Sequence, residues 1–193
     1  MVIFTPDKRH TDMEQSFDLS PELAKQARYE AFLPRLAALI EGIDDEVAVL
    51  ANTAAALREA FGFFWVGFYR AADGELRLGP FQGTVACYRI RKGRGVCGTA
   101  FAEGRSIVVP DVELFPGHIA CSSLSRSEIV VPLFSTGSDR TVRGVLDIDS
   151  DRPAAFDETD RCWLERIAAL ISETIYRHGL FRTCTQTPER PPL

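Results

Sequence analysis

The spacing of the apolar residues changes near residue 63, and this change constrains the fold more than any other feature of the sequence. Between residues 44 and 61, apolar side chains recur every three or four positions, which is the interval of one helix face. Over residues 63–70, successive side chains alternate between two faces, as they do in a strand. The chain is therefore expected to begin with helices and to continue with a sheet.

Capping residues and turns divide the rest of the chain into further elements. We expect a first helix from Ser20 to Ile40 with a bend at Pro34, a second helix from Asp44, and a final helix capped by Asp157. The remaining expected elements are a short helix at 98–104 and strands at 63–70, 75–83, 106–112, 127–135 and 142–150. The first two strands and the last two are each joined by a turn, so both pairs are expected to form hairpins.

Strands that are grouped together, with helices at both ends, predict an α+β fold in which helices pack on one face of the sheet. The 193 residues are enough for one domain with a substantial core. We assign this domain to residues 18–182. A flexible N-terminal arm is expected at 1–17, and a disordered, proline-rich tail at 183–193.

Charge and hydropathy exclude some classes of function. The net charge is −5, and the basic residues are scattered apart from one run at 89–94, which is unlike the basic footprint of a nucleic-acid-binding protein. The start of the chain does not look like a signal peptide, and no apolar run is long enough to span a membrane. We therefore expect a cytoplasmic protein whose thiols are kept reduced.

Three of the five cysteines lie in segments rich in glycine or proline. A thiolate forms more readily at a polar, partly exposed position than in an apolar core, so Cys87, Cys97 and Cys121 suggest a reactive thiol with resolving partners. Cys121 is the best candidate nucleophile, because an imidazolium at His118 would lower its pKa. Cys162 and Cys184 carry no such signal.

Two other ligand sites compete with this interpretation. Cys87, Cys97, His118 and Cys121 could bind zinc, but structural zinc sites usually draw their ligands in close pairs, so we expect no metal. Residues 93–98 match the glycine pattern of a dinucleotide-binding loop. The helix that follows is too short for a nucleotide-binding crossover, so this pattern is weak.

A second candidate group is acidic and aromatic. Asp147 and Asp149 share one face of a strand, where mutual repulsion raises the pKa of at least one carboxyl, and Glu128 on the preceding strand could complete the cluster. A solvent-exposed outer face is the alternative. Trp65 and Tyr69 form a similar face on the first strand, either as ordinary sheet packing or as a surface for a small sulfur-bearing group.

These segments together resemble the GAF-domain free methionine-R-sulfoxide reductases from about residue 20 to residue 177. The matching motifs are WVGFYR (65–70), GPFQGTVAC (79–87), GRGVCGTA (93–100), FPGHIAC (115–121), SEIVVPL (127–133) and GVLDIDS (144–150). The resemblance implies a GAF-like central antiparallel sheet, with helices on one face and a small ligand pocket on the other. It implies free methionine sulfoxide as the substrate.

The resemblance also implies a role for each site residue. Cys121 would be the nucleophile, Cys87 the main resolving cysteine and Cys97 an auxiliary one. Trp65 and Tyr69 would flank the substrate's methyl group, while the acids Glu128, Asp147 and Asp149 would hold its ammonium group and protonate the sulfoxide oxygen.

The implied cycle passes through a Cys121 sulfenic acid and a Cys87–Cys121 disulfide, without a bound cofactor. Thioredoxin with NADPH would reopen the disulfide, and the enzyme would be a homodimer. The main alternative is a non-catalytic GAF module that binds a small ligand or senses redox state. A thiol enzyme that reduces peroxide or repairs protein-bound methionine is a third candidate.

Overall fold

The computed structural model describes residues 16–20, 22–118, 123–137 and 139–176. Its elements, in chain order, are α1 (Lys25–Ile40), α2 (Glu46–Phe61), β1 (Trp65–Ala72), β2 (Glu75–Gln82), β3 (Arg89–Arg91), α3 (Gly95–Glu103), β4 (Ile107–Val109), a 3-10 turn (Val112–Leu114), β5 (Ser127–Phe134), β6 (Val142–Ser150) and α4 (Glu158–Tyr176). The expectations for residues 1–15, for the tail at 183–193 and for Cys121 concern positions outside the described residues.

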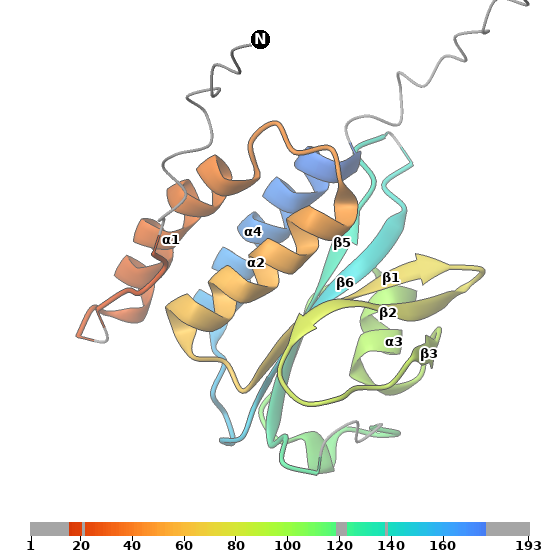
Figure 1. Cartoon of the computed structure of the whole chain (residues 1–193). Helices are drawn as coiled ribbons and strands as arrows, with labels where there is room; N and C mark the ends of the chain where they lie inside the picture. The colour runs from red at the N-terminus through yellow and green to blue at the C-terminus, as the bar shows by residue number, and fades with distance from the viewer. Residues whose placement is uncertain (1–15, 21, 119–122, 138, 177–193) are drawn as a thin grey trace, which may run out of the picture.

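The strands form one antiparallel sheet in the order β3-β2-β1-β6-β5-β4 (Figure 1). Both predicted hairpins, β1–β2 and β5–β6, are confirmed. At the centre of the sheet β1 pairs with β6, so Trp65 lies opposite Asp149 and Tyr69 opposite Val145. The predicted α+β architecture is confirmed.

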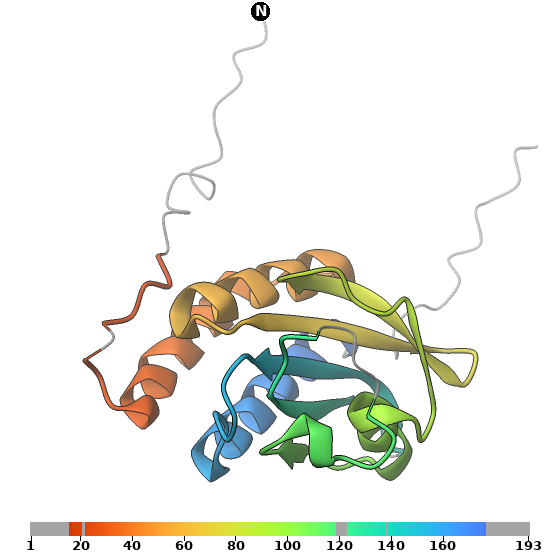
Figure 2. The same ribbon diagram turned by 90° about the horizontal axis from the view of Figure 1, so that it is seen from below.

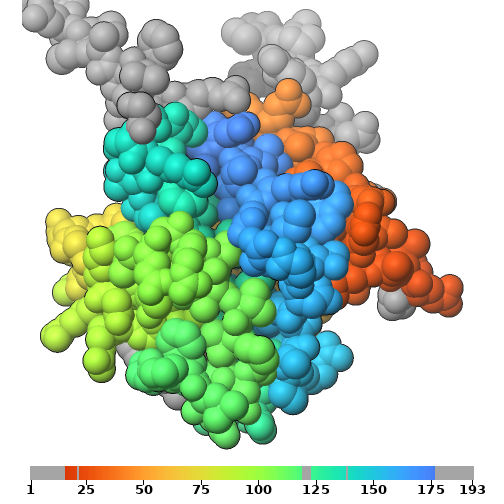
Figure 3. Space-filling model, turned by 180° about the vertical axis from the view of Figure 1, so that it is seen from behind, coloured from red at the N-terminus to blue at the C-terminus, as the bar shows by residue number. Residues whose placement is uncertain are grey.

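Helices cover the sheet unequally. α1, α2 and α4 lie on one face, and the short helix α3 lies on the other (Figures 1 and 2). Seen from behind, α3 and the residues after it share a surface with α4 (Figure 3). There Ser106 Oγ donates a hydrogen bond to Glu165 Oε1 at 2.7 Å. No helix in the described part of the chain is long and apolar enough to cross a membrane.

The alternation in β1 separates two apolar clusters, as its period of two predicts. Val66 and Phe68 pack with residues of α1, α2 and α4 in the larger cluster. Trp65 and Tyr69 belong to a smaller cluster on the opposite face, which also contains Cys97 and other residues of α3. The smaller cluster is where the predicted site residues gather.

The first helix differs from the expectation at its start. α1 begins at Lys25, because the hydroxyl and carbonyl of Ser20 close a turn with Glu22 and Leu23 instead of capping the helix. Pro34 lies at an exposed position inside α1 and does not end the helix. Phe17, assigned to the arm, is buried against Phe32.

Two further elements were not predicted, and one begins earlier than expected. β3 has a single apolar residue, Ile90, between two arginines, which is too short a pattern to detect. The turn at Val112–Leu114 was also missed. α3 starts at Gly95 rather than after Cys97, so Cys97 lies in the first turn of a helix instead of in a loop.

A buried polar group ties α1 to the start of α4. The Tyr29 hydroxyl donates to Asp160 Oδ1 at 2.9 Å, and Asp160 Oδ2 accepts from the Asp157 backbone at 2.9 Å and from Lys25 Nζ. Tyr29 and Asp160 are both buried. Since a buried donor that loses its acceptor keeps its full desolvation penalty, Asp160 stabilises this junction more than a surface carboxylate would.

Asp160→Ala should lower the free energy of unfolding by roughly 2–4 kcal/mol, because it leaves the Tyr29 hydroxyl unpaired in the core. Denaturant titration followed by circular dichroism would measure the loss. Asp151→Ala removes an exposed carboxylate nearby and should have almost no effect. Equal stabilities of the two variants would contradict the role assigned to Asp160.

Candidate active site

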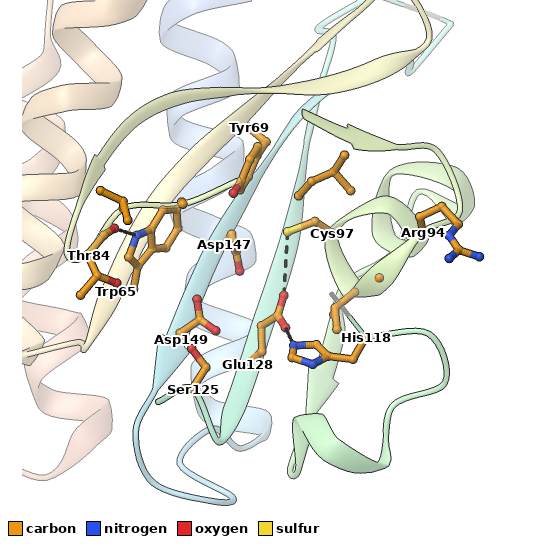
Figure 4. A pocket seen from close by; sticks show the side chains of 15 residues that line it. Trp65, Tyr69, Thr84, Arg94, Cys97, His118, Ser125, Glu128, Asp147 and Asp149 are labelled. Atoms are coloured by element: carbon orange, nitrogen blue, oxygen red, sulfur yellow. Dashed lines mark hydrogen bonds and ion pairs between the residues drawn. The ribbon is translucent and has the colours of Figure 1, made fainter. Parts of the chain in front are cut away.

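A small pocket lies between α3 and the sheet face opposite α1, α2 and α4 (Figure 4). Its cavity has a volume of about 40 Å³. The lining residues come from β1, the segment after β2, β3, α3 and the residue before it, the segment before β5, and strands β5 and β6: Trp65, Tyr69, Thr84, Val85, Ala86, Ile90, Arg94, Gly95, Val96, Cys97, His118, Ser125, Glu128, Asp147 and Asp149. Of the predicted site residues that the structure describes, the pocket contains all but Cys87; Cys121 lies outside the described residues.

The three predicted acids meet in this pocket. Asp147 and Asp149 point to the same side of β6, and Glu128 lies opposite Asp149 on β5. Glu128 and Asp147 are each only 6% exposed, so the face is not the solvent-exposed one of the alternative interpretation. In the described part of the chain, no lysine or arginine nitrogen lies within 4 Å of these carboxyls to neutralise them.

Burial and mutual repulsion keep protons on this cluster. Desolvation, followed by the charge of neighbouring acids, raises the pKa of Glu128 and of Asp147 well above the usual range. Burial raises the pKa of Asp149 to about 6, although a hydrogen bond from Ser125 partly opposes this. One oxygen of Asp147, Oδ1, is buried without any hydrogen-bond partner. The pocket thus offers acidic protons and an unpaired acceptor near neutral pH.

Cys97 differs from its sequence-based interpretation as a partly exposed thiol. Its side chain is 4% exposed, and its Sγ lies 3.8 Å from Glu128 Oε1. Burial, followed by the charges of Asp147 and Glu128, raises its pKa well above that of a free thiol, so Cys97 is a neutral donor. The cause is the close docking of α3: a side chain at Gly98 would collide with the Arg91 carbonyl.

The other cysteines are in different states. Cys87 is disulfide-bonded, whereas Cys97 and the exposed Cys162 are free thiols. Cys121 and Cys184 lie outside the described residues. While Cys87 is in a disulfide it cannot serve as a zinc ligand, so the competing zinc set that included it is not available in this state. Within the described residues, the group with metal-ligand spacing is Cys97, Glu128 and Asp147.

His118 faces the acids. Its Nε2 lies 3.8 Å from Glu128 Oε2. Burial lowers the pKa of its imidazole, which disagrees with the expected imidazolium that would activate Cys121. The Glu128 carboxyl is thus bordered by the Cys97 thiol on one side and by a neutral imidazole on the other (Figure 4).

Two aromatic rings form the opposite wall. The ring centroids of Trp65 and Tyr69 are 6.2 Å apart, and the Trp65 indole donates to the Thr84 carbonyl at 2.9 Å. A side chain at Gly67 would lie 2.6 Å from the Trp65 ring, so glycine is needed between them. Thr84 and Ser125 were missed by sequence reasoning. Thr84 acts through its backbone, which leaves no signal in the sequence.

The raised pKa of Asp149 predicts a pH-dependent stability. A carboxyl whose pKa is higher in the folded than in the unfolded state favours folding below the unfolded value near 4, and this contribution disappears as pH rises through about 6. The loss is on the order of 2–3 kcal/mol. In the Asp149→Asn variant this side chain cannot titrate. The free energy of unfolding of the variant, relative to that of the parent chain, should therefore rise between pH 4 and pH 7.

Denaturant titrations of both chains across this pH range, in buffer with EDTA, would measure the difference. Glu128 and Asp147 titrate in the same direction and remain in the variant, so only part of the pH dependence should disappear. A difference that stays constant from pH 4 to pH 7 would show that Asp149 is not desolvated as the structure indicates.

Comparison with known proteins identifies the family of this chain and several similar proteins. The GAF domain family model matches residues 45–175. The GAF domain-containing protein A of Dictyostelium discoideum is 54% identical over 149 residues, covering 77% of this chain and 92% of the relative. The free methionine-R-sulfoxide reductase of Escherichia coli is 45% identical over 139 residues, covering 72% and 82%.

A solved structure agrees with these relatives. The free methionine-R-sulfoxide reductase of Neisseria meningitidis, in complex with its substrate, superimposes with a TM-score of 0.76 at 54% identity. The match covers 79% of this chain and 90% of the other.

Proposed function

The chain belongs to the GAF domain family and to its free methionine-R-sulfoxide reductases, and we propose that it reduces free L-methionine-(R)-S-oxide to L-methionine through a cysteine redox cycle. The observation that carries this proposal is the small pocket in which buried, protonated carboxyls face two aromatic rings. Such a pocket accepts an amino acid and can supply a proton to it. The protein is thus an oxidoreductase that acts on a sulfur group.

The lining supports binding of a free amino acid rather than a peptide. The acids Glu128, Asp147 and Asp149 would hold the ammonium group, for which the unpaired Oδ1 of Asp147 provides an acceptor. A peptide-bound residue has no such ammonium group. Trp65 and Tyr69 would flank the methyl group, since sulfur and its substituents pack favourably on aromatic rings.

The proposed chemistry uses a thiolate and an acid together. The Cys121 thiolate attacks the sulfoxide sulfur while a carboxylic acid of the cluster protonates the oxygen. The oxygen passes to Cys121 as a sulfenic acid, and the substrate sulfur leaves as the thioether of methionine, reduced by two electrons. The Cys87 thiol then displaces water from the sulfenic acid and forms a disulfide with Cys121.

The state of the cysteines supports this division of roles. Cys87 is disulfide-bonded, and neither Cys97 nor Cys162 is its partner because both are free. A resolving cysteine is expected to be found in this state after oxidation. We assign Cys97 an auxiliary role, since its buried thiol contacts Glu128.

The cycle needs an external dithiol but no bound cofactor. We propose thioredoxin, itself reduced at the expense of NADPH, as the reductant that reopens the disulfide by thiol exchange. We also propose a cytoplasmic location, where such a reductant keeps thiols reduced. A homodimer is proposed from the resemblance alone.

A coupled assay tests the activity: NADPH oxidation with thioredoxin, thioredoxin reductase and free L-methionine-(R)-S-oxide. We expect turnover of the R epimer and none of the S epimer or of peptide-bound methionine sulfoxide. No turnover of the free R epimer would favour the alternative of a non-catalytic GAF module.

Single-turnover experiments test the cysteine roles. Cys121→Ser should produce no methionine, because no thiolate attacks the sulfoxide. Cys87→Ser should release about one equivalent of methionine per chain and then stop, because its sulfenic acid is not resolved. Amino-acid analysis after quenching would count the product.

Cys162→Ser is the matched control, since Cys162 is exposed on α4, which lies on the face of the sheet opposite the pocket. It should turn over like the parent chain. Multiple turnovers by Cys87→Ser would show that another thiol resolves the intermediate.

A further inference from the structure

Three potential metal ligands converge in the pocket from three different elements. The Sγ of Cys97 on α3, a carboxylate oxygen of Glu128 on β5 and one of Asp147 on β6 all lie within 4.8 Å of one another. In Figure 4 the three side chains point toward one another. The residues are separated by up to 50 positions in the sequence, so their spacing in the chain does not predict this arrangement.

The cluster is incompletely satisfied. Asp147 is only 6% exposed, and its Oδ1 has no hydrogen-bond partner. The described polar neighbours of Glu128 are the weak donor Cys97, the imidazole of His118 and the carboxyl of Asp147. A buried carboxylate oxygen without a partner is costly, and a cation beside it would remove that cost.

The donor set matches one class of cation. A thiolate with two carboxylates suits zinc or cadmium rather than magnesium or calcium, which prefer oxygen ligands alone. Bond lengths of about 2.0–2.3 Å put neighbouring donors of a tetrahedral zinc site roughly 3–4 Å apart. Small rotations of the Cys97, Glu128 and Asp147 side chains would therefore bring their ligand atoms to bonding distance of one ion. The cavity leaves room for a water as the fourth ligand.

We propose that Cys97, Glu128 and Asp147 bind one thiophilic divalent cation, zinc in the first instance, inside the substrate pocket. Binding displaces the protons of the thiol and of the two carboxyls. His118, whose Nε2 lies 3.8 Å from Glu128 Oε2, would orient the Glu128 carboxylate as a ligand. Given the proposed function, the ion occupies the place of the substrate's ammonium group, so zinc and methionine sulfoxide exclude each other.

Zinc binding to the oxidised protein distinguishes this site from one that uses several cysteine thiols. With Cys87 in its disulfide, a site that needed Cys87 would be lost, whereas Cys97 stays free. Isothermal titration of the oxidised, EDTA-treated and desalted chain with zinc chloride should show one equivalent bound. With cadmium, an ultraviolet thiolate-to-metal absorption band should appear.

Two variants test the ligands. Cys97→Ser and Asp147→Asn should each raise the zinc dissociation constant at least about tenfold, and Cys97→Ser should also lose the cadmium band. Cys162→Ser, which removes an exposed thiol outside the pocket, should bind zinc like the parent chain. Circular dichroism would confirm that each variant is folded.

Absence of zinc binding, or equal affinity of all four chains, would overturn the proposal. Free L-methionine-(R)-S-oxide added to the titration should raise the apparent zinc dissociation constant, and an unchanged constant would overturn the exclusion. The outcome is independent of the coupled assay: a chain that reduces the sulfoxide without binding zinc refutes this inference alone, and one that binds zinc without turnover refutes the proposed function.

Discussion

The pairing of β1 with β6 joins the two halves of the chain, and the pocket depends on it. Trp65 and Tyr69 arrive on β1, and Asp147 and Asp149 on β6; the register sets Trp65 opposite Asp149. A slip of one residue would turn every one of these side chains toward the helices α1, α2 and α4. The apolar residues on the other face, such as Phe68 and Leu146, prevent that slip because they are fully buried there.

Burying the polar groups of this pocket lowers the stability of the folded state. Three carboxyls, a thiol and an imidazole are brought together with little exposure to water and, among the described residues, without a lysine or arginine partner. Their charged forms are penalised by desolvation, so Glu128 and Asp147 stay protonated instead. The same penalty makes the cluster useful, because a neutral carboxyl donates a proton and an unpaired oxygen attracts a cation.

Local patterns predicted much of the fold. The period of two placed Asp147 and Asp149 on one face of β6, and the hairpin turn brought Glu128 beside them. Other features had no local signal. The start of α3 was placed too late, because its first turn depends on the close approach of Gly98 to the backbone of β3. For the same reason Cys97 was taken for an exposed thiol.

The sequence by itself determined which side chains of each strand share one face, since strand alternation is a property of neighbouring positions. It also carried the motifs that identify the family. Only the tertiary structure decided the protonation of those side chains. The pKa values of Cys97, Glu128, Asp147 and His118 follow from how much water the packing of α3 against the sheet removes, and from charges on strands distant in sequence. Desolvation is a property of the assembled fold, so no pattern along the chain records it.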